Sequence, residues 1–292
     1  MTHIYTRRFR VRHYELDSLG HVNNAVYLNY LQQVGMEASA DAGYDLDRYD
    51  EMGVLWLVRK TIIEYGRPAT FGDELLAKTW VSDFGRVQSH REYHLTLAGD
   101  GETVARARIK WAFLNQETLA PTRIPQRMID TFRPNGRRSV RRLKPGQGEK
   151  PVANCHRYLS QRRVQHYELD SARHVNNAVY LNWVEQAFFD ASSRAGYPPD
   201  SLPGQLGVVI IVRRNEIDYF RPAMDGDQIE ITSWVNTMAR THGTWIHEMR
   251  RAADQTLLAR AYSTGAFLDL EGRPRRLPEV YQAAILRGGS NP

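Results

Sequence analysis

The sequence predicts an α+β protein made of two tandem copies of one unit, in which each copy is an antiparallel sheet wrapped around a long buried helix. Three observations lead to this prediction: a near-identical segment that occurs twice, an apolar stretch of helical length inside each occurrence, and alternating polar and apolar residues after it. The length of 292 residues also fits two domains.

The repeat is visible by inspection. Residues 13–29 read HYELDSLGHVNNAVYLN, and residues 166–182 read HYELDSARHVNNAVYLN, so 15 of 17 positions are identical. In contrast, only 5 of the 25 positions in 76–100 match their partners in the second copy. Packing alone tolerates volume-preserving exchanges, so near-identity that includes His, Asp and Asn indicates a geometric or chemical requirement. Gene conversion or a shared tight turn is the alternative.

The helix follows from the second half of this segment. Asn23 or Asn24 is a suitable N-cap, and the residues from Ala25 to Ala38 are apolar on nearly every side. A helix that is apolar all round has to be buried. We therefore expect a buried helix about 20 Å long in each copy.

Alternating residues predict antiparallel strands with one face open to water. Residues 104–111 alternate between basic and apolar side chains, and residues 229–235 between apolar and polar ones. A strand over 4–15 leads into the helix, and residues 99–101 (Gly-Asp-Gly) are a candidate hairpin turn. Each copy is thus expected to hold a helix followed by about four strands.

The net charge of +6 comes from one segment between the copies. Residues 133–150 hold seven basic residues, one acid and five prolines or glycines, which is typical of a linker. We predict a first domain over 1–132, a basic linker over 133–154 and a second domain over 155–292. The linker is a solvated tether or a strap that meets phosphates or an acidic carrier protein. Nucleic-acid binding is not favoured, because no basic face with interleaved aromatics is evident.

Several classes of protein are excluded at this stage. No apolar run approaches the ~20 residues that span a bilayer, and no signal peptide is evident. The single cysteine, Cys155, excludes an internal disulfide and fits a reducing cytoplasm. His13-x-Glu15 and His166-x-Glu168 lack a third ligand, so we predict no metal. Cofactor motifs and the G-x-S-x-G elbow are absent, so we predict no cofactor.

The repeated motif resembles that of the hotdog-fold thioesterases. The pattern over 17–24, DSLGHVNN, with Tyr27-Leu28 in a buried helix, is similar to 4-hydroxybenzoyl-CoA-type acyl-CoA thioesterases and to acyl-ACP thioesterases. The resemblance covers both halves, so it implies a double hotdog in which the two domains pack as a pseudo-dimer, with sites at their interface. Assembly of whole chains into a homo-oligomer stays open.

The resemblance also implies site residues. The family's catalytic acid corresponds to Asp17 and Asp170, and its histidine to His21 and His174. The substrate-binding positions that it implies are Asn23, Asn24, Ala25, Tyr27, Asn176, Asn177, Ala178 and Tyr180.

Departures from the family pattern bear on the substrate. Acyl-ACP thioesterases carry an Asn two residues after the Asp, where this chain has Leu19 and Ala172, and this favours an acyl-CoA over an acyl-ACP substrate. The second copy has Arg173 where the family often has Gly. The first copy has Gln32 where the family often has Glu, and Glu185 fills that place in the second copy.

These residue types permit thioester hydrolysis. Amides near Asn24 and Ala25, and their counterparts in the second copy, lie at a helix N-terminus and are candidates to polarise the carbonyl. Asp17 is a candidate general base or a nucleophile that forms an anhydride, and its structural alternative is a loop-closing Asp. His21 orients the acid or shapes the loop. Arg67 and Arg221 hold turns or contact CoA phosphates.

We therefore expect a cytoplasmic thioester hydrolase acting on an acyl-CoA, with an acyl-ACP as the alternative substrate. A hotdog hydratase or dehydratase for enoyl thioesters is a second hypothesis, although its pattern places the His five residues after the Asp, whereas Asp17 and His21 are four apart. A non-catalytic binder of acyl thioesters is the third.

Overall fold

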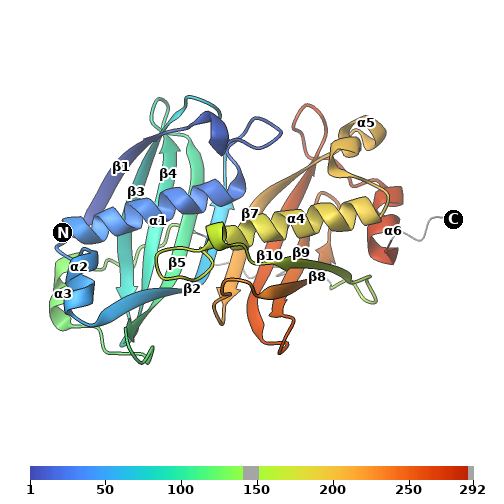
Figure 1. Ribbon diagram of the computed structural model, residues 1–292. Coiled ribbons are helices and arrows are strands. Elements are labelled where there is room, and N and C mark those ends of the chain that lie inside the picture. The colour runs from blue at the N-terminus through green and yellow to red at the C-terminus, as the bar shows by residue number, and fades with distance from the viewer. Residues whose placement is uncertain (141–150, 289–292) are drawn as a thin grey trace. The chain divides into compact units, whose positions relative to one another are not determined.

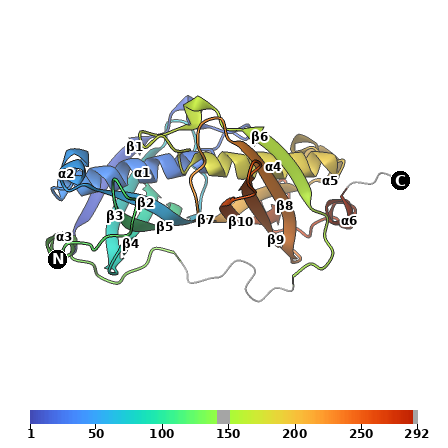
Figure 2. The ribbon, with the colours of Figure 1, turned by 60° about the horizontal axis from the view of Figure 1, so that its bottom comes forward.

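The computed structural model describes residues 1–140 and 151–288 and divides into two compact units, Met1–Arg142 and Leu143–Pro292, one for each copy (Figure 1). The middle of the predicted linker, 141–150, lies outside the described residues. In each unit a long helix lies against an antiparallel sheet, which confirms the predicted fold class (Figure 2).

The first copy is built on a sheet whose strand order is β1-β3-β4-β5-β2. Its strands are β1 (Ile4–Arg10), β2 (Val54–Tyr65), β3 (Glu74–Phe84), β4 (Gln88–Leu97) and β5 (Thr103–Asn115). Its helices are η1 (His13–Glu15), α1 (Asn24–Asp41), α2 (Leu46–Glu51) and α3 (Gln126–Phe132). Neighbouring strands pair antiparallel throughout, as the alternating residues predicted.

The second copy repeats this order strand for strand, as β6-β8-β9-β10-β7. Its strands are β6 (Tyr158–Arg163), β7 (Val209–Tyr219), β8 (Gln228–Met238), β9 (His242–Arg251) and β10 (Leu257–Leu268). Its helices are η2 (His166–Glu168), α4 (Val179–Arg194), η3 (Pro199–Ser201), α5 (Leu202–Leu206) and α6 (Glu279–Arg287). Both copies therefore place the repeated segment between the edge strand and the long helix.

Helix α1 is buried on most of its circumference, as expected for its apolar sequence. Leu31 and Val34 are 0% exposed, and each fully buried side chain of this kind stabilises the fold by about 1.5–3 kcal/mol. The prediction of burial on every side is wrong in one respect. Asn29, Gln33 and Met36 form a narrow exposed strip, because their spacing of four and three residues places them on one line along the helix.

The two ends of the predicted linker each bind a sheet at a β-bulge. The bulge in the first copy and the bulge in the second copy lie at equivalent positions. A register shift in β3 next to Ser82 frees its carbonyl, which accepts the amide of Gly136 at 2.8 Å. The matching shift in β8 next to Asn236 frees a carbonyl that accepts the amide of Val152 at 2.8 Å. Both ends of the predicted linker are therefore fixed to a sheet by their backbone.

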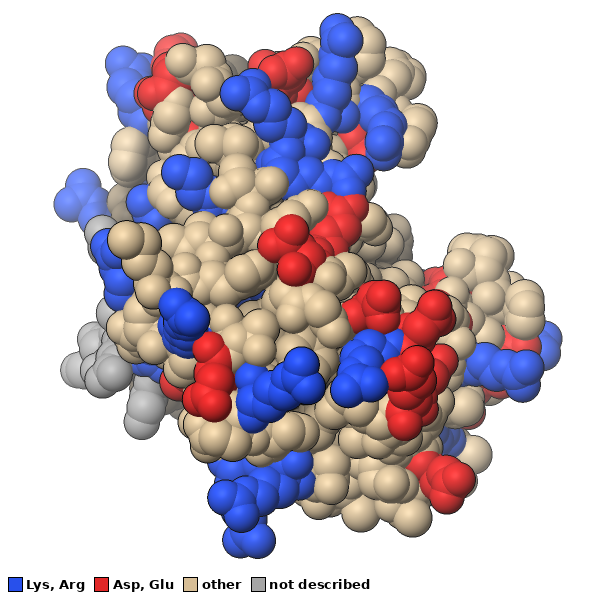
Figure 3. Space-filling view, turned by 90° about the vertical axis from the view of Figure 1, so that its left-hand side faces the viewer, with Lys and Arg blue, Asp and Glu red and all other residues tan. Residues whose placement is uncertain are grey.

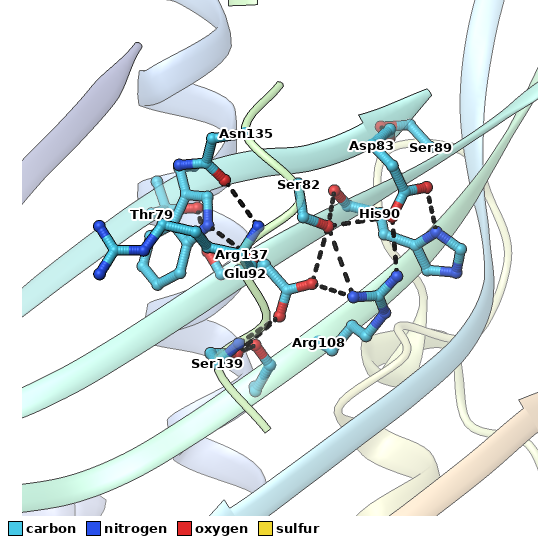
Figure 4. Close-up of polar contacts among 12 residues, drawn as sticks. Thr79, Ser82, Asp83, Ser89, His90, Glu92, Arg108, Asn135, Arg137 and Ser139 are labelled. Carbon is cyan, nitrogen blue, oxygen red and sulfur yellow. Dashed lines mark hydrogen bonds and ion pairs between the residues drawn. The ribbon is translucent and has the colours of Figure 1, made fainter. Parts of the chain in front are cut away.

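Residues 134–140, which we call the strap, cross the face of the first sheet opposite α1 (Figure 4). Ser139 donates its amide and its hydroxyl to the Glu92 carboxylate, at 2.9 and 2.7 Å. Under the strap, Glu92 is 0% exposed and forms an ion pair with Arg108, which is 5% exposed. The sheet face that the sequence predicts to be open to water is thus covered at Arg108.

Two further observations concern the charged surface and the helices. On the face of the molecule drawn in Figure 3, Lys and Arg side chains are interspersed with Asp and Glu side chains. Within 1–140 and 151–288, no helix is long and apolar enough to cross a membrane.

Candidate active site

The loop that carries Asp17 is closed by the aspartate itself. The amide of Asp17 donates to the carbonyl of His21 at 2.7 Å, and Asp17 Oδ1 accepts the amides of Leu19 and His21 at 2.9 and 3.1 Å. Asp17 is half-buried, and no described residue bonds its second carboxylate oxygen. The loop-closing role that was the structural alternative for Asp17 therefore rests on Oδ1, and Oδ2 takes no part in it.

The second copy forms the same loop. The amide of Asp170 donates to the carbonyl of His174 at 2.8 Å, and Asp170 Oδ1 accepts the amide of Ala172 at 2.9 Å. One position differs: Gly20 has a φ of 76°, and its counterpart Arg173 has a φ of 59°. This left-handed conformation costs a side-chain-bearing residue about 1–2 kcal/mol, which explains the glycine in the first copy.

Asn23 is the N-cap of α1, and it is one of the two residues, Asn23 or Asn24, that the sequence predicts for this role. Its Oδ1 accepts the amide of Ala25 at 2.8 Å, and Asn176 Oδ1 accepts the amide of Ala178 at 2.9 Å. The prediction that these two alanine amides face the substrate is therefore corrected, because they are already bound by Asn23, the cap of α1, and by Asn176, which lies three residues before α4.

The neighbouring asparagines keep their polar groups available. Among the described residues, none accepts the backbone amide or bonds the side-chain amide of Asn24 or Asn177. Their carbonyls are held in place, since Tyr65 and Tyr219 donate their hydroxyls to Asn24 and Asn177 at 3.2 and 3.1 Å. Asn24 thus offers donors at the first residue of α1, and Asn177 offers them two residues before α4; the partial positive charge of a helix N-terminus favours an anion there.

His21 and His174 contribute to the loop through their backbone. Their carbonyls accept the aspartate amides, and no described group bonds either imidazole. Neither ring orients the aspartate by a hydrogen bond. Both side chains are half-buried beside the acid loop, so each ring nitrogen is available to a ligand.

Tyr27 and Tyr180 are occupied inside the fold rather than open to a substrate. Their hydroxyls accept the amides of Ala69 and Ala223 at 3.3 and 3.1 Å. Burial, with a smaller contribution from the nearby Asp17 carboxylate, raises the pKa of Tyr27 to about 12. Burial likewise raises the pKa of Tyr180 to about 12. These tyrosines hold the turn after β2 or β7 against the long helix.

Arg67 and Arg221 are both exposed and make local contacts. Arg67 Nη1 binds Asp100 and Glu102 in the β4–β5 hairpin, at 2.8 and 3.0 Å. Arg221 Nη1 donates to the carbonyl of Phe220 at 3.2 Å. Of the two roles predicted for both arginines, holding a turn fits these contacts.

Two buried glutamates were missed as members of the site. Glu15 and Glu168 are 6% and 7% exposed, and their carbonyls accept the amides of the capping Asn23 and Asn176. The available signal was their presence in both copies two residues before the aspartate. Within the described ranges, no group of three His, Cys, Asp or Glu side chains is arranged to hold a metal ion.

Both halves of the chain match thioesterase families. The family "Acyl-ACP thioesterase N-terminal domain" matches residues 2–132, and the "Thioesterase-like superfamily" matches residues 164–285.

Curated relatives match at low identity. The chain is 24% identical over 259 residues to oleoyl-acyl carrier protein thioesterase 1, chloroplastic, of Arabidopsis thaliana, covering 82% of this chain and 66% of that protein. It is 27% identical over 194 residues to a chloroplastic acyl-[acyl-carrier-protein] hydrolase of Cuphea viscosissima, covering 62% of this chain and 46% of that protein. The chain thus spans about two thirds of the length of the first relative and less than half of the length of the second.

Two solved structures share the fold over most of their length. A putative oleoyl thioesterase from Lactobacillus plantarum has a TM-score of 0.74 at 17% identity, covering 94% of this chain and 97% of that one. The 12:0-ACP thioesterase from Umbellularia californica has a TM-score of 0.72 at 18% identity, covering 90% and 94%. The tandem arrangement of two hotdog domains is therefore shared with these structures.

Proposed function

Because the chain belongs to the hotdog-fold thioesterases, with one copy of the fold in each half, we propose that it hydrolyses an acyl thioester to a free acid and a thiol. The observation that carries the proposal is the carboxylate of Asp17 and of Asp170. In each, one oxygen is held by loop amides while the other has no partner among the described residues, and the loop ends at the N-terminus of the long helix.

Each aspartate is proposed to act as general base on a water molecule. The unbonded oxygen takes a proton as the water oxygen attacks the thioester carbon, and the C–S bond then breaks as the thiolate leaves and is protonated. A positioned base of this kind contributes about 10²–10⁴ in rate. Direct attack by the carboxylate, through an anhydride that water then opens, gives the same products.

The amide donors of Asn24 and Asn177 are proposed to stabilise the oxyanion. The thioester carbonyl gains negative charge in the transition state, and donors already fixed in direction stabilise it without reorganising. The carbonyls of both asparagines are tied to tyrosine hydroxyls, which fixes the direction of the residues.

We propose an acyl group carried by acyl carrier protein as the first substrate to test. The names of the curated relatives and the family matched by the first half support it. An acyl-CoA is the second candidate, because Leu19 and Ala172 stand where acyl-ACP thioesterases resembling this motif carry Asn. Acyl-ACPs and acyl-CoAs of matched chain length, compared by kcat/KM, separate the two.

The test is release of free thiol by the wild type and by Asp17→Asn, Asp170→Asn and the double variant. We expect the variant of a working copy to lose about 10²–10⁴ in kcat, and the double variant to fall to background. Ser18→Ala and Ser171→Ala, at exposed neighbours in the same loops, are the matched controls and are expected to keep wild-type turnover. A double variant that turns over like the wild type would refute the assignment.

A further inference from the structure

A buried carboxylate ties the acid loop of the first copy to its helix. Glu15 Oε2 accepts the amide of Arg12 at 2.7 Å and the hydroxyl of Tyr30 at 2.6 Å, and the Arg12 guanidinium lies 3.3 Å from Oε1. The carbonyl of the same residue accepts the amide of Asn23 at 2.9 Å. Glu15 therefore contacts the start of η1, the second turn of α1 and the residue that caps α1.

The second copy keeps the acceptor and changes the donors. Glu168 Oε2 accepts the amide of Gln165 at 2.9 Å, and Oε1 accepts the indole Nε1 of Trp183 at 3.0 Å. Its ion-pair partner is Arg162, which lies six residues before it rather than three. Its carbonyl accepts the amide of Asn176 at 2.9 Å. The carboxylate is therefore satisfied in both copies by a different set of side chains.

This pattern points to a requirement for the carboxylate itself. A buried charge is costly unless it is paired and hydrogen-bonded, and replacement of a whole buried ion pair by apolar residues of similar volume is often neutral for stability. The helix donor has nevertheless changed between Tyr30 and Trp183 while the acceptor stayed. Burial, and then the bond to Glu15, raise the pKa of the Tyr30 hydroxyl, so it stays a donor.

The position of the glutamate explains what it fixes. One residue, Leu16, separates Glu15 from Asp17, and the Glu15 carbonyl sets the place of Asn23, next to the available donors of Asn24. A base and an oxyanion donor have to be held together, because a misplacement of about 1 Å costs as much as a hundredfold in rate.

We propose that Glu15 and Glu168 are positioning residues, which hold the catalytic aspartate of each copy in register with the helix N-terminus. This inference rests on the proposed function. Neither glutamate is proposed to touch the substrate; each acts through the loop and the cap that it joins.

The experiment removes only the helix donor. Tyr30→Phe and Trp183→Phe leave the carboxylate in place, whereas Trp183→Tyr replaces the donor of the second copy by that of the first. In a copy whose aspartate is active, we expect the Phe variant to lose about tenfold to a hundredfold in kcat at unchanged KM, and Trp183→Tyr to keep most of it. The control is Tyr158→Phe, which removes a buried hydroxyl donating to the carbonyl of Ile285 and is expected to keep kcat.

A second measurement does not depend on turnover. Hydrogen exchange of the amides of Leu19 and His21, which donate to Asp17, is expected to be faster in Tyr30→Phe than in the wild type. Glu15→Gln and Glu168→Gln keep the side-chain volume but replace one acceptor oxygen by an NH2 donor, which then faces other donors. Both variants are also expected to speed exchange of the loop amides.

The outcomes separate this inference from the proposed function. Phe variants with wild-type kcat and wild-type exchange overturn the positioning role, as does an equal loss of kcat in Tyr158→Phe. A wild type that releases no thiol contradicts the proposed function instead, and the exchange rates then decide whether the glutamates hold the loop.

Discussion

In the first copy the sheet face opposite the long helix holds the buried pair Glu92 and Arg108, whereas the equivalent paired positions of the second copy hold Ile246 and Tyr262. The acid loops of the two copies, in contrast, share two bonds: the aspartate amide donates to the histidine carbonyl, and the aspartate Oδ1 accepts the amide two residues later. Strand faces have thus been free to exchange polar for apolar partners while the loop geometry has not. The constraint on this chain lies in the loops that carry the candidate acids.

The largest expected effect on stability comes from a substitution in the sheet of the first copy, where the two copies differ. Glu92→Ala removes the buried carboxylate from the Arg108 guanidinium, whose remaining acidic partner is the half-exposed Asp83 at 2.8 Å, so we expect a loss of about 3 kcal/mol in the free energy of unfolding. Replacing both residues by the pair of the second copy, Glu92→Ile with Arg108→Tyr, is expected to recover most of that loss. Urea unfolding measures both.

Glu74→Ala is the control, because its contact with Arg8 is exposed and contributes at most about 1 kcal/mol. A loss in Glu92→Ala as small as in this control would contradict a stabilising role for the pair.

A second difference lies on the opposite face, where Tyr93 in the first copy corresponds to His247 in the second. Burial lowers the pKa of His247 to about 3, so the ring is neutral in the folded chain. Below pH ~6.5 only the unfolded chain takes up a proton there, so stability falls by about 1.4 kcal/mol per pH unit.

In His247→Tyr, the loss of stability between pH 6.5 and 4.5 is therefore expected to be smaller than in the wild type by about 2 kcal/mol. Unfolding at the two pH values measures it, with the exposed His166→Asn as control. An unchanged slope in His247→Tyr would show that the buried ring is not the acid-sensitive group.

The third prediction concerns a bond that both copies keep, from an asparagine side chain to the amide two residues later. Asn23→Ala and Asn176→Ala each remove one cap bond of nearly equal length, so each is expected to cost about 1 kcal/mol. Thermal unfolding checks this, with the exposed, mid-helical Asn29→Ala expected to cost little. A loss confined to one copy would mean that the asparagine bond contributes to stability only in that copy, α1 starting at Asn24 and α4 two positions later, at Val179.

The smallest expected effect concerns the one backbone position where the loops differ. Arg173→Gly relieves the backbone strain of a left-handed residue that carries a side chain. The free energy of unfolding is expected to rise by a few tenths to about 1 kcal/mol, because glycine loses more backbone entropy on folding. Gly20→Arg is expected to lose a similar amount, because a Cβ at Gly20 meets no atom within 4 Å and only backbone strain remains. Opposite signs in thermal unfolding are the expected result; equal signs would contradict it.

The sequence predicts those features that depend on neighbours along the chain. The repeat, the buried α1 and its cap at Asn23 follow from spacing within one element, and so does the hairpin turn near Gly101. Features that depend on distant partners were missed. Glu15 is recognisable as an acceptor only once Tyr30, fifteen residues away, is known to face it. Likewise, no local signal shows that Ser139 covers Glu92.

The bulge contacts have a practical consequence for anyone who wishes to study a single copy. A cut at Phe132, where the sequence places the end of the first domain, would strip away Gly136 and Ser139 and uncover a carboxylate that is otherwise sealed from solvent. A truncation that ends after Val140 keeps Gly136 and Ser139, which cover Glu92 on this face of the sheet. The boundary between the two copies therefore lies after the strap and not at the end of α3.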